Sequence, residues 1–269
     1  VVNLSLTGNG NSATNNFAPD NTGTLTLGQD SGKQTYTGGI DATGVDGTVT
    51  LNGEIETVDT ALKLGAVTLG SNVILDTDAV TAAGPGDVTI GAVTGGAKTL
   101  NIETGSGVAG TDVNGTSISN VTTLTLANIG GTAAFTGDVD VTTLTAGNTV
   151  VNLSLTGNGN SATNNFAPDN TGTLTLGQDS GKQTYTGGID ATGVDGTVTL
   201  NGEIETVDTA LKLGAVTLGS NVILDTDAVT AAGPGDVTIG AVTGGAKTLN
   251  IETGSGVAGT DVNGTSISN

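Results

Sequence analysis

The chain has 269 residues and a formal net charge of −20, with 26 acidic residues against six basic ones. Such a charge repels phosphate backbones and anionic lipid surfaces, so we expect no nucleic-acid partner and no membrane insertion of this segment. Cysteine and histidine are absent, which excludes disulfides and sites built on a thiolate or an imidazole.

Period-two alternation of apolar and polar residues is the main local signal along the chain. It predicts half-buried strands, and Thr, Val and Ile favour strands as well. Turn-forming glycine and asparagine separate the alternating segments. Residues 56–64 are the one weak helical candidate, and Thr57, Val58 and Thr60 argue against it, so we predict an all-β chain. The predicted strands are residues 2–6, 24–27, 48–51, 67–69, 88–90, 100–102, 123–126 and 139–141.

Residues 150–269 repeat residues 1–120 letter for letter, with a period of 149 residues. We therefore divide the chain into a first repeat unit, 1–149, and a second, truncated unit, 150–269, and expect both to belong to one continuous solenoid. A catalytic site gains little from duplication, whereas a fibre or a surface array gains length. The repeat therefore favours a structural or adhesive segment of a longer array over an enzyme.

The predicted strands recur at intervals of roughly 18–24 residues along much of the repeat. The repeat therefore divides into about seven turns of about 21 residues, the size of one turn of a parallel β-helix. Small aliphatic residues suit the thin core of such a β-solenoid, and glycine and asparagine suit its corners. Tandem β-sandwich domains are the alternative, although sandwiches usually centre on aromatic residues and this chain has only two Tyr and three Phe. Disorder is a further alternative for an acidic, glycine-rich chain, but its apolar residues are patterned rather than scattered.

Three pairs of aspartates are candidates for binding calcium, because Ca²⁺ takes carboxylate and carbonyl oxygens from glycine- and asparagine-rich turns. None matches the glycine-rich calcium nonapeptide, and general surface charge is the alternative for all of them. The candidate residues are Asp76 with Asp78, Asp138 with Asp140, and Asp41 with Asp46.

Carboxylates two positions apart lie on one face of a strand, as do Asp138 with Asp140 and Glu54 with Glu56. Such pairs can act as general acid and base in polysaccharide cleavage. The chain has no arginine or histidine and few aromatic residues to hold a sugar, so we expect solvated acidic faces instead. No catalytic residue is predicted, and calcium is the one candidate cofactor.

The segments GDVTIGAVTGGAKTLNIETGSG, GTVTLNGEI and AVTLGSNVILDTD resemble repeats of large bacterial surface proteins. These proteins are filamentous-haemagglutinin-like adhesins and autotransporter passenger domains. The resemblance implies a parallel β-helix, an extracellular or cell-surface location, and a role in adhesion or coat formation.

The expected function is a structural or adhesive repeat segment of a bacterial cell-surface or secreted fibre. The expected partners are further copies of the repeat, end to end or within a longer array, and the surface of a host or a neighbouring cell or a polysaccharide. Two alternatives stay open: a surface-layer lattice protein that binds calcium, and a β-helix that binds or cleaves polysaccharide.

Overall fold

The structure, a computed structural model, describes residues 2–78, 84, 86–105, 109–227, 233, 235–254 and 260–269. Within these ranges every regular element is a β-strand, which confirms the all-β prediction. No helix among them is long and apolar enough to cross a membrane. The chain divides into two compact units, Val1–Ala134 and Phe135–Asn269, and each is described by itself. That the two sequence repeats form one continuous solenoid stays a prediction.

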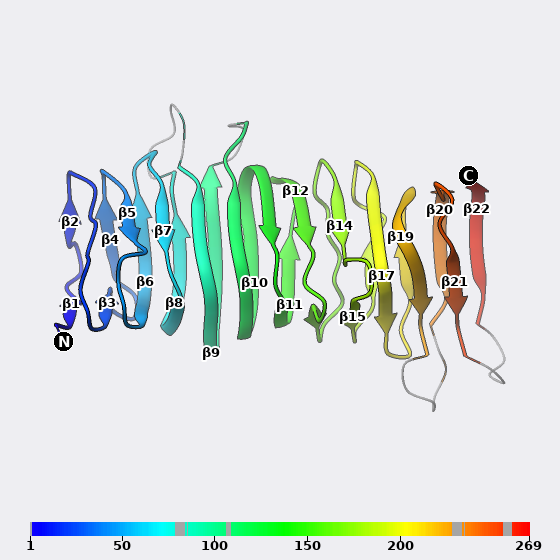
Figure 1. Cartoon of the computed structure of the whole chain (residues 1–269), viewed down its shortest axis with the longest axis horizontal. Coiled ribbons are helices and arrows are strands. Elements are labelled where there is room, and N and C mark those ends of the chain that lie inside the picture. Colours follow the sequence, from blue (N-terminus) through cyan, green and yellow to red (C-terminus); the bar gives the residue numbers. More distant parts are fainter. Residues whose placement is uncertain are drawn as a thin grey trace. The chain divides into compact units, whose positions relative to one another are not determined.

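The first unit contains strands β1 to β10, which Figure 1 labels in part. Strand β10 ends at Phe135, the first residue of the second unit. The bounds are β1 Leu4–Leu6, β2 Ser12–Ala13, β3 Leu25–Leu27, β4 Lys33–Tyr36, β5 Ile40–Ala42, β6 Val49–Thr57, β7 Leu62–Leu64, β8 Val67–Asp76, β9 Val88–Gly105 and β10 Val113–Phe135. All the predicted strands of this unit lie in or overlap these elements. The short strands β2, β4, β5 and β7 are additional, and β6 and β7 take up most of the weak helical candidate.

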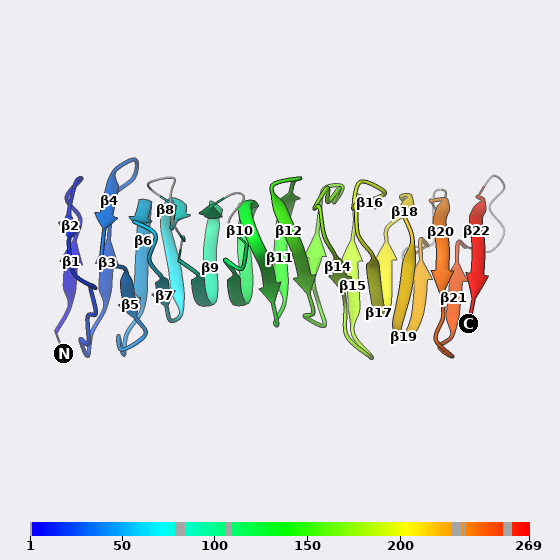
Figure 2. The same cartoon turned by 90° about the horizontal axis from the view of Figure 1, so that it is seen from above.

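The second unit contains strands β11 to β22, seen from another side in Figure 2. The bounds are β11 Val139–Ala146, β12 Val150–Leu155, β13 Ser161–Ala162, β14 Leu174–Leu176, β15 Lys182–Tyr185, β16 Ile189–Ala191, β17 Val198–Thr206, β18 Leu211–Leu213, β19 Val216–Asp225, β20 Val237–Thr243, β21 Leu249–Glu252 and β22 Val262–Ser268.

Strands of successive turns form three parallel ladders in the first unit. The first ladder joins β1, β3, β6 and β8, with Leu4, Leu25, Val49 and Val67 in register. The second joins β2 and β4 with the later parts of β6, β8 and β9, and the third joins β5, β7, β9 and β10. The second unit repeats this arrangement. The fold is therefore a parallel β-solenoid with turns about 22 residues apart, not a set of antiparallel sandwiches.

Alternation along the strands builds the core, because every second side chain points inward. Ten apolar residues that the pattern places inside are all at most 1% exposed: Leu25, Leu27, Val49, Leu51, Val88, Ile90, Leu100, Ile102, Leu124 and Leu126. The intervening Thr26, Thr50, Thr89, Asn101 and Thr125 are partly or fully exposed, as expected. Like residues stack on like residues from turn to turn, which gives a mostly aliphatic interior to which Tyr36, Tyr185, Phe135 and Phe166 add the largest buried side chains.

The aromatic pair of the first unit consists of Tyr36, which is buried in the core, and Phe17, which is half-buried. The rings of Phe17 and Tyr36 stack with centroids 5.2 Å apart. The Tyr36 hydroxyl donates to Oε1 of the buried Gln34 at 2.9 Å, and Gln34 Nε2 donates to the carbonyl oxygens of Leu6 and Gly8. Burial raises the pKa of Tyr36 to about 12. The Tyr36 ring therefore serves packing and offers no exposed platform for a ligand.

The two copies of the repeat fold alike in their interiors and differ at their first and last turns, where a stacking neighbour is missing or different. Strands β3 to β8 recur as β14 to β19 with the same lengths, whereas the counterpart of β9 is divided into β20 and β21. Val113 and Ile118 are fully buried, while their counterparts Val262 and Ile267 are 51% and 73% exposed.

Candidate functional site

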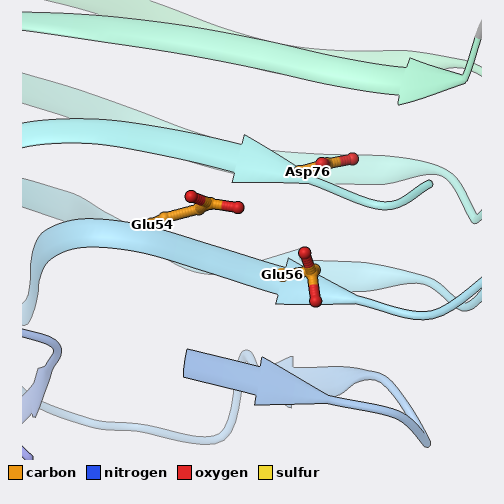
Figure 3. A group of neighbouring side chains, drawn as sticks. All are labelled: Glu54, Glu56 and Asp76. Carbon is orange, nitrogen blue, oxygen red and sulfur yellow. The ribbon is translucent and has the colours of Figure 1, made fainter. Parts of the chain in front are cut away.

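The most concentrated chemistry of the first unit is a group of three carboxylates on neighbouring strands of the second ladder. Glu54 and Glu56 lie on β6, and Asp76 lies on β8 directly beside Glu56 in register (Figure 3). One oxygen of each side chain lies within 4.8 Å of the others. The group exists because alternation places Glu54 and Glu56 on one side of β6 and the register of the turns adds Asp76.

Lys33 neutralises part of this group from the preceding turn. Its ammonium contacts Glu56 Oε2 and lies 3.1 Å from Glu54 Oε1. The Thr35 hydroxyl donates to the second Glu56 oxygen, Oε1, at 2.9 Å. Glu56 is only 4% exposed, so the prediction of a solvated acidic face is wrong at this position. A buried carboxylate needs partners for its oxygens, and β4 supplies them.

Asp76 has no such cation among the described residues, so the neighbouring negative charges act on its carboxyl without compensation. Burial raises the pKa of its carboxyl, and the charges of Glu103, Glu54 and Asp78 raise it further. A hydrogen bond of 2.8 Å from the Asp78 backbone N–H to Asp76 Oδ1 opposes the shift. The site therefore favours a proton or a cation at Asp76 more than a free aspartate would.

Asp78 follows Asp76 at the end of the same strand and shares its environment. Burial raises the pKa of Asp78, and the charges of Asp59 and Glu103 act in the same direction. Asp59 adopts a positive φ of 52° and has a buried side-chain oxygen, Oδ1, without a hydrogen-bond partner. Asp76 and Asp78, which the sequence predicted as a pair, therefore lie in one acidic environment. We call these two residues the acidic corner.

Glu103 on β9 is in register with Asp76 and extends the stack of acidic side chains by one turn. We call Glu54, Glu56, Asp76 and Glu103 together the acidic ladder. Its oxygens accept hydrogen bonds from Asn101 Nδ2 at 2.5 Å and from Asn128 Nδ2 at 2.8 Å. Two of the stacked carboxylates, Glu56 and Glu103, are therefore satisfied by side chains of the protein. Asp76 between them accepts one hydrogen bond from the described residues, that of the Asp78 backbone N–H.

The second unit repeats the site with Glu203, Glu205 and Asp225. Lys182 contacts Glu205 and lies 3.3 Å from Glu203, and the hydrogen bond to Glu205 is the main cause that raises the pKa of Lys182. These two groups are the only sets of three or more acidic side chains within such a distance in the described part of the chain. Asp78, Asp138, Asp140, Asp41 and Asp46 belong to neither.

Asp138 and Asp140, the second predicted pair, are both exposed and bind the next turn of the second unit. Asp138 Oδ1 accepts from the Gly159 backbone N–H at 2.7 Å, and Asp140 Oδ1 accepts from the Ser161 hydroxyl at 2.6 Å. Each carboxylate thus joins successive turns at its own position. That they hold calcium stays a prediction.

Asp41 and Asp46, the third predicted pair, lie in β5 and in the turn that follows it. Asp41 Oδ1 accepts from the Thr43 hydroxyl at 2.6 Å, and this hydrogen bond is the main cause that lowers the pKa of Asp41. The charge of Lys63, its register partner on β7, acts in the same direction. Asp46 is exposed, and calcium at this pair also stays a prediction.

Sequence reasoning missed Glu103 as a member of the acidic ladder, and Lys33 and Thr35 as its partners. Lys33 precedes Glu54 by 21 positions (54 − 33), but Asp76 precedes Glu103 by 27 (103 − 76). No constant spacing therefore marks the ladder. What the ladder can do chemically is hold charge across turns and exchange a proton or a cation at Asp76.

Comparison with known proteins adds no relative: no protein-family model, no curated protein and no solved structure matches the chain. The resemblance to bacterial surface proteins stays a prediction.

Proposed function

We propose that the chain is a structural or adhesive repeat segment of a large bacterial cell-surface or secreted fibre protein. The observation that carries the proposal is that the identical sequence of both copies builds the same ladders in each unit. Strands β3, β6 and β8 recur as β14, β17 and β19 with the same register. A sequence that repeats its fold whenever it recurs adds length by simple duplication.

Two features of the surface support this role. The acidic excess of 26 to six keeps long assemblies soluble and apart from one another. Inter-turn hydrogen bonds of surface side chains, such as Asp140 with Ser161 and Thr35 with Glu56, tie each turn to the next. Both features serve a long, exposed protein, and neither requires a reaction.

Assembly end to end is the natural extension of this role. An open end of a solenoid presents unpaired backbone groups, and such edges recruit other strands. A head-to-tail contact does not close on itself, so it propagates as a filament. Further copies of the repeat are therefore the proposed partners, and the proposed location is the cell surface or the extracellular space.

A series of proteins with one, two and three complete 149-residue repeats tests the proposal. Each added repeat should lengthen the particle by roughly 34 Å in electron micrographs, because about seven turns rise ~4.8 Å each. The matched control carries Leu126→Asp in one repeat, which places a charge among the stacked apolar residues and should interrupt the rod there. Particles that grow in width rather than in length would contradict the proposal.

A further inference from the structure

A polar cavity recurs at the same place in both copies of the repeat. In the first unit it has a volume of about 410 Å³ and is lined by Thr7, Gly28, Gln29, Asp30, Ser31 and Asn52. In the second unit the residues 149 positions later, together with Asn158, line a cavity of about 610 Å³. Hydroxyl, amide and carboxylate side chains make up most of the residues on the walls, and each wall also includes a glycine, Gly28 or Gly177.

The cavity exists because the turn between β3 and β4 is longer than the matching part of the next turn. Leu27 pairs with Leu51, 24 positions later, but Lys33 pairs with Glu54, only 21 positions later. Three residues must therefore bulge outward, and Gln29, Asp30 and Ser31 do so with exposed side chains.

The bulge is held firmly by its glycines and by backbone hydrogen bonds. Gly28 has a φ of 76°, and a Cβ at this position would lie 1.9 Å from the Asn52 carbonyl oxygen. The Gly28 N–H donates to Leu6 O at 3.0 Å, the Gly32 N–H to Gln29 O at 2.9 Å, and the Glu54 N–H to Gly32 O at 2.8 Å. The second copy has the same bonds. A turn fixed in this way loses little conformational entropy when it binds a ligand.

The side chains of the bulge are free to bind. In the described part of the chain Gln178, Asp179 and Ser180 make no side-chain hydrogen bond or ion pair, and the same holds for Gln29, Asp30 and Ser31. In each turn the glutamine amide offers two N–H donors and an acceptor oxygen, the serine hydroxyl offers a donor and an acceptor, and the aspartate offers a carboxylate acceptor. Thr156 beside the second turn donates its hydroxyl to Phe135 O at 3.3 Å and adds an acceptor oxygen. This mixture suits a ligand rich in hydroxyl groups.

A second cavity of about 360 Å³ lies against the same turn in the second unit and shares Asp179 and Ser180 with the first. It is lined further by Glu203, Asn221, Ile223 and Asn250 from the following turns. Ile223 is half-buried and lines this wall, which therefore also offers an apolar contact. The two cavities reach from Asn158 across five turns, roughly 19 Å at the spacing of paired strands.

We propose that the Gln178–Ser180 turn and the cavities beside it bind an uncharged polysaccharide chain, and that the Gln29–Ser31 turn is a second copy of this site. The length of the two cavities together favours an extended polymer over a small compact ligand. Charge excludes acidic polymers, because the walls carry Asp179 and Glu203 and no basic residue. Lys182 nearby is engaged by Glu203 and Glu205. This inference specifies the ligand of the proposed adhesive function, and it rests on that proposed function.

Titration calorimetry and a glycan array with uncharged hexasaccharides, namely glucans, mannans and chitin fragments, test the site. At least one should bind with a stoichiometry near two per chain, and hexagalacturonate should bind at least tenfold more weakly. Gln178→Ala/Asp179→Ala/Ser180→Ala should reduce the stoichiometry to one. Adding Gln29→Ala/Asp30→Ala/Ser31→Ala should lower the affinity at least tenfold.

The matched control is Asp20→Ala/Asp169→Ala, which also removes two negative charges. Both positions are exposed, and neither lines any of these cavities. It should bind as the parent does, and circular dichroism should show all variants folded. Absence of binding to every uncharged glycan, equal binding of hexagalacturonate, or unchanged binding of the six-residue variant overturns the inference. The repeat-length series is measured separately, so failure of sugar binding and failure of rod growth are distinguished.

Discussion

Lys33 and Glu56 form an ion pair across neighbouring turns, in which a half-exposed ammonium covers an almost fully buried carboxylate. The Lys33 side chain is 49% exposed and that of Glu56 only 5%. Lys182 and Glu205 repeat the pair in the second unit at 49% and 7%. The pair allows a carboxylate to lie at the edge of the core, because the lysine and Thr35 replace the water that burial removes.

Replacing Lys33 by methionine should therefore destabilise the first unit. Lys33→Met leaves the buried Glu56 charge without its cation, and we expect the free energy of unfolding to fall by about 1–2 kcal/mol, less than for a fully buried pair because Lys33 is half exposed. Urea denaturation at pH 7 measures the effect. The control Lys98→Met removes a lysine that makes no ion pair with any described residue. An equal loss in both variants would show that charge number, not the pair, matters.

Asp76→Asn should stabilise the protein at neutral pH. The folded-state pKa of Asp76 is raised, so its favourable contribution to stability is present below the unfolded pKa and is lost as the pH rises through the folded pKa. At pH 7 the charged side chain therefore costs stability, by up to about 1 kcal/mol after allowance for solvent screening. The variant should gain in melting temperature over the parent at pH 7, and the gain should shrink below about pH 4.

Asp41→Asn is the matched control with the opposite sign. Its hydrogen bonds with Thr43 lower the pKa of Asp41, so its contribution is present above the unfolded pKa and is lost as the pH falls through the folded pKa. This variant should melt slightly lower than the parent at pH 7. A gain in both variants would mean that reduced net charge alone explains the result.

Leu126→Asp should cost several kcal/mol, about 3–5, because an unpaired charge would enter the apolar stack. Leu126 is 1% exposed and lies beside Ile102 in register. Thr122→Asp adds the same charge at an exposed position of the same strand and should change the stability little. Thermal unfolding followed by circular dichroism compares the two. Similar melting temperatures would show that the assigned inward face is wrong.

Calcium should raise the melting temperature more than a sodium salt of equal ionic strength. Millimolar Ca²⁺ can bridge carboxylates, whereas sodium mainly screens their repulsion. If the acidic corner is the site, Asp76→Asn/Asp225→Asn should abolish the calcium-specific part, while Asp138→Asn/Asp140→Asn and Asp41→Asn/Asp46→Asn should leave it. Equal increases in calcium and sodium would point to screening without a specific site.

The sequence by itself determined the fold class and the inward face of most strands. Residues such as Leu25, Thr26 and Leu27 specify their own faces, because alternation along a strand is a local property of the backbone. Small aliphatic side chains without large aromatics suit a narrow core, and the exact repeat implies that the same strands recur. These features depend only on near neighbours in the chain, so they could be predicted without a structure.

The tertiary structure alone decided which side chains meet across turns. Connections of unequal length set the register, so Lys33 meets Glu54 and Asp76 meets Glu103 at different spacings, and Glu56 lies buried although its pattern predicted a solvated face. The same inequality pushes Gln29, Asp30 and Ser31 outward and forms the polar cavity. Contacts between turns depend on the whole path of the chain around the solenoid, and alternation within one strand carries no information about that path.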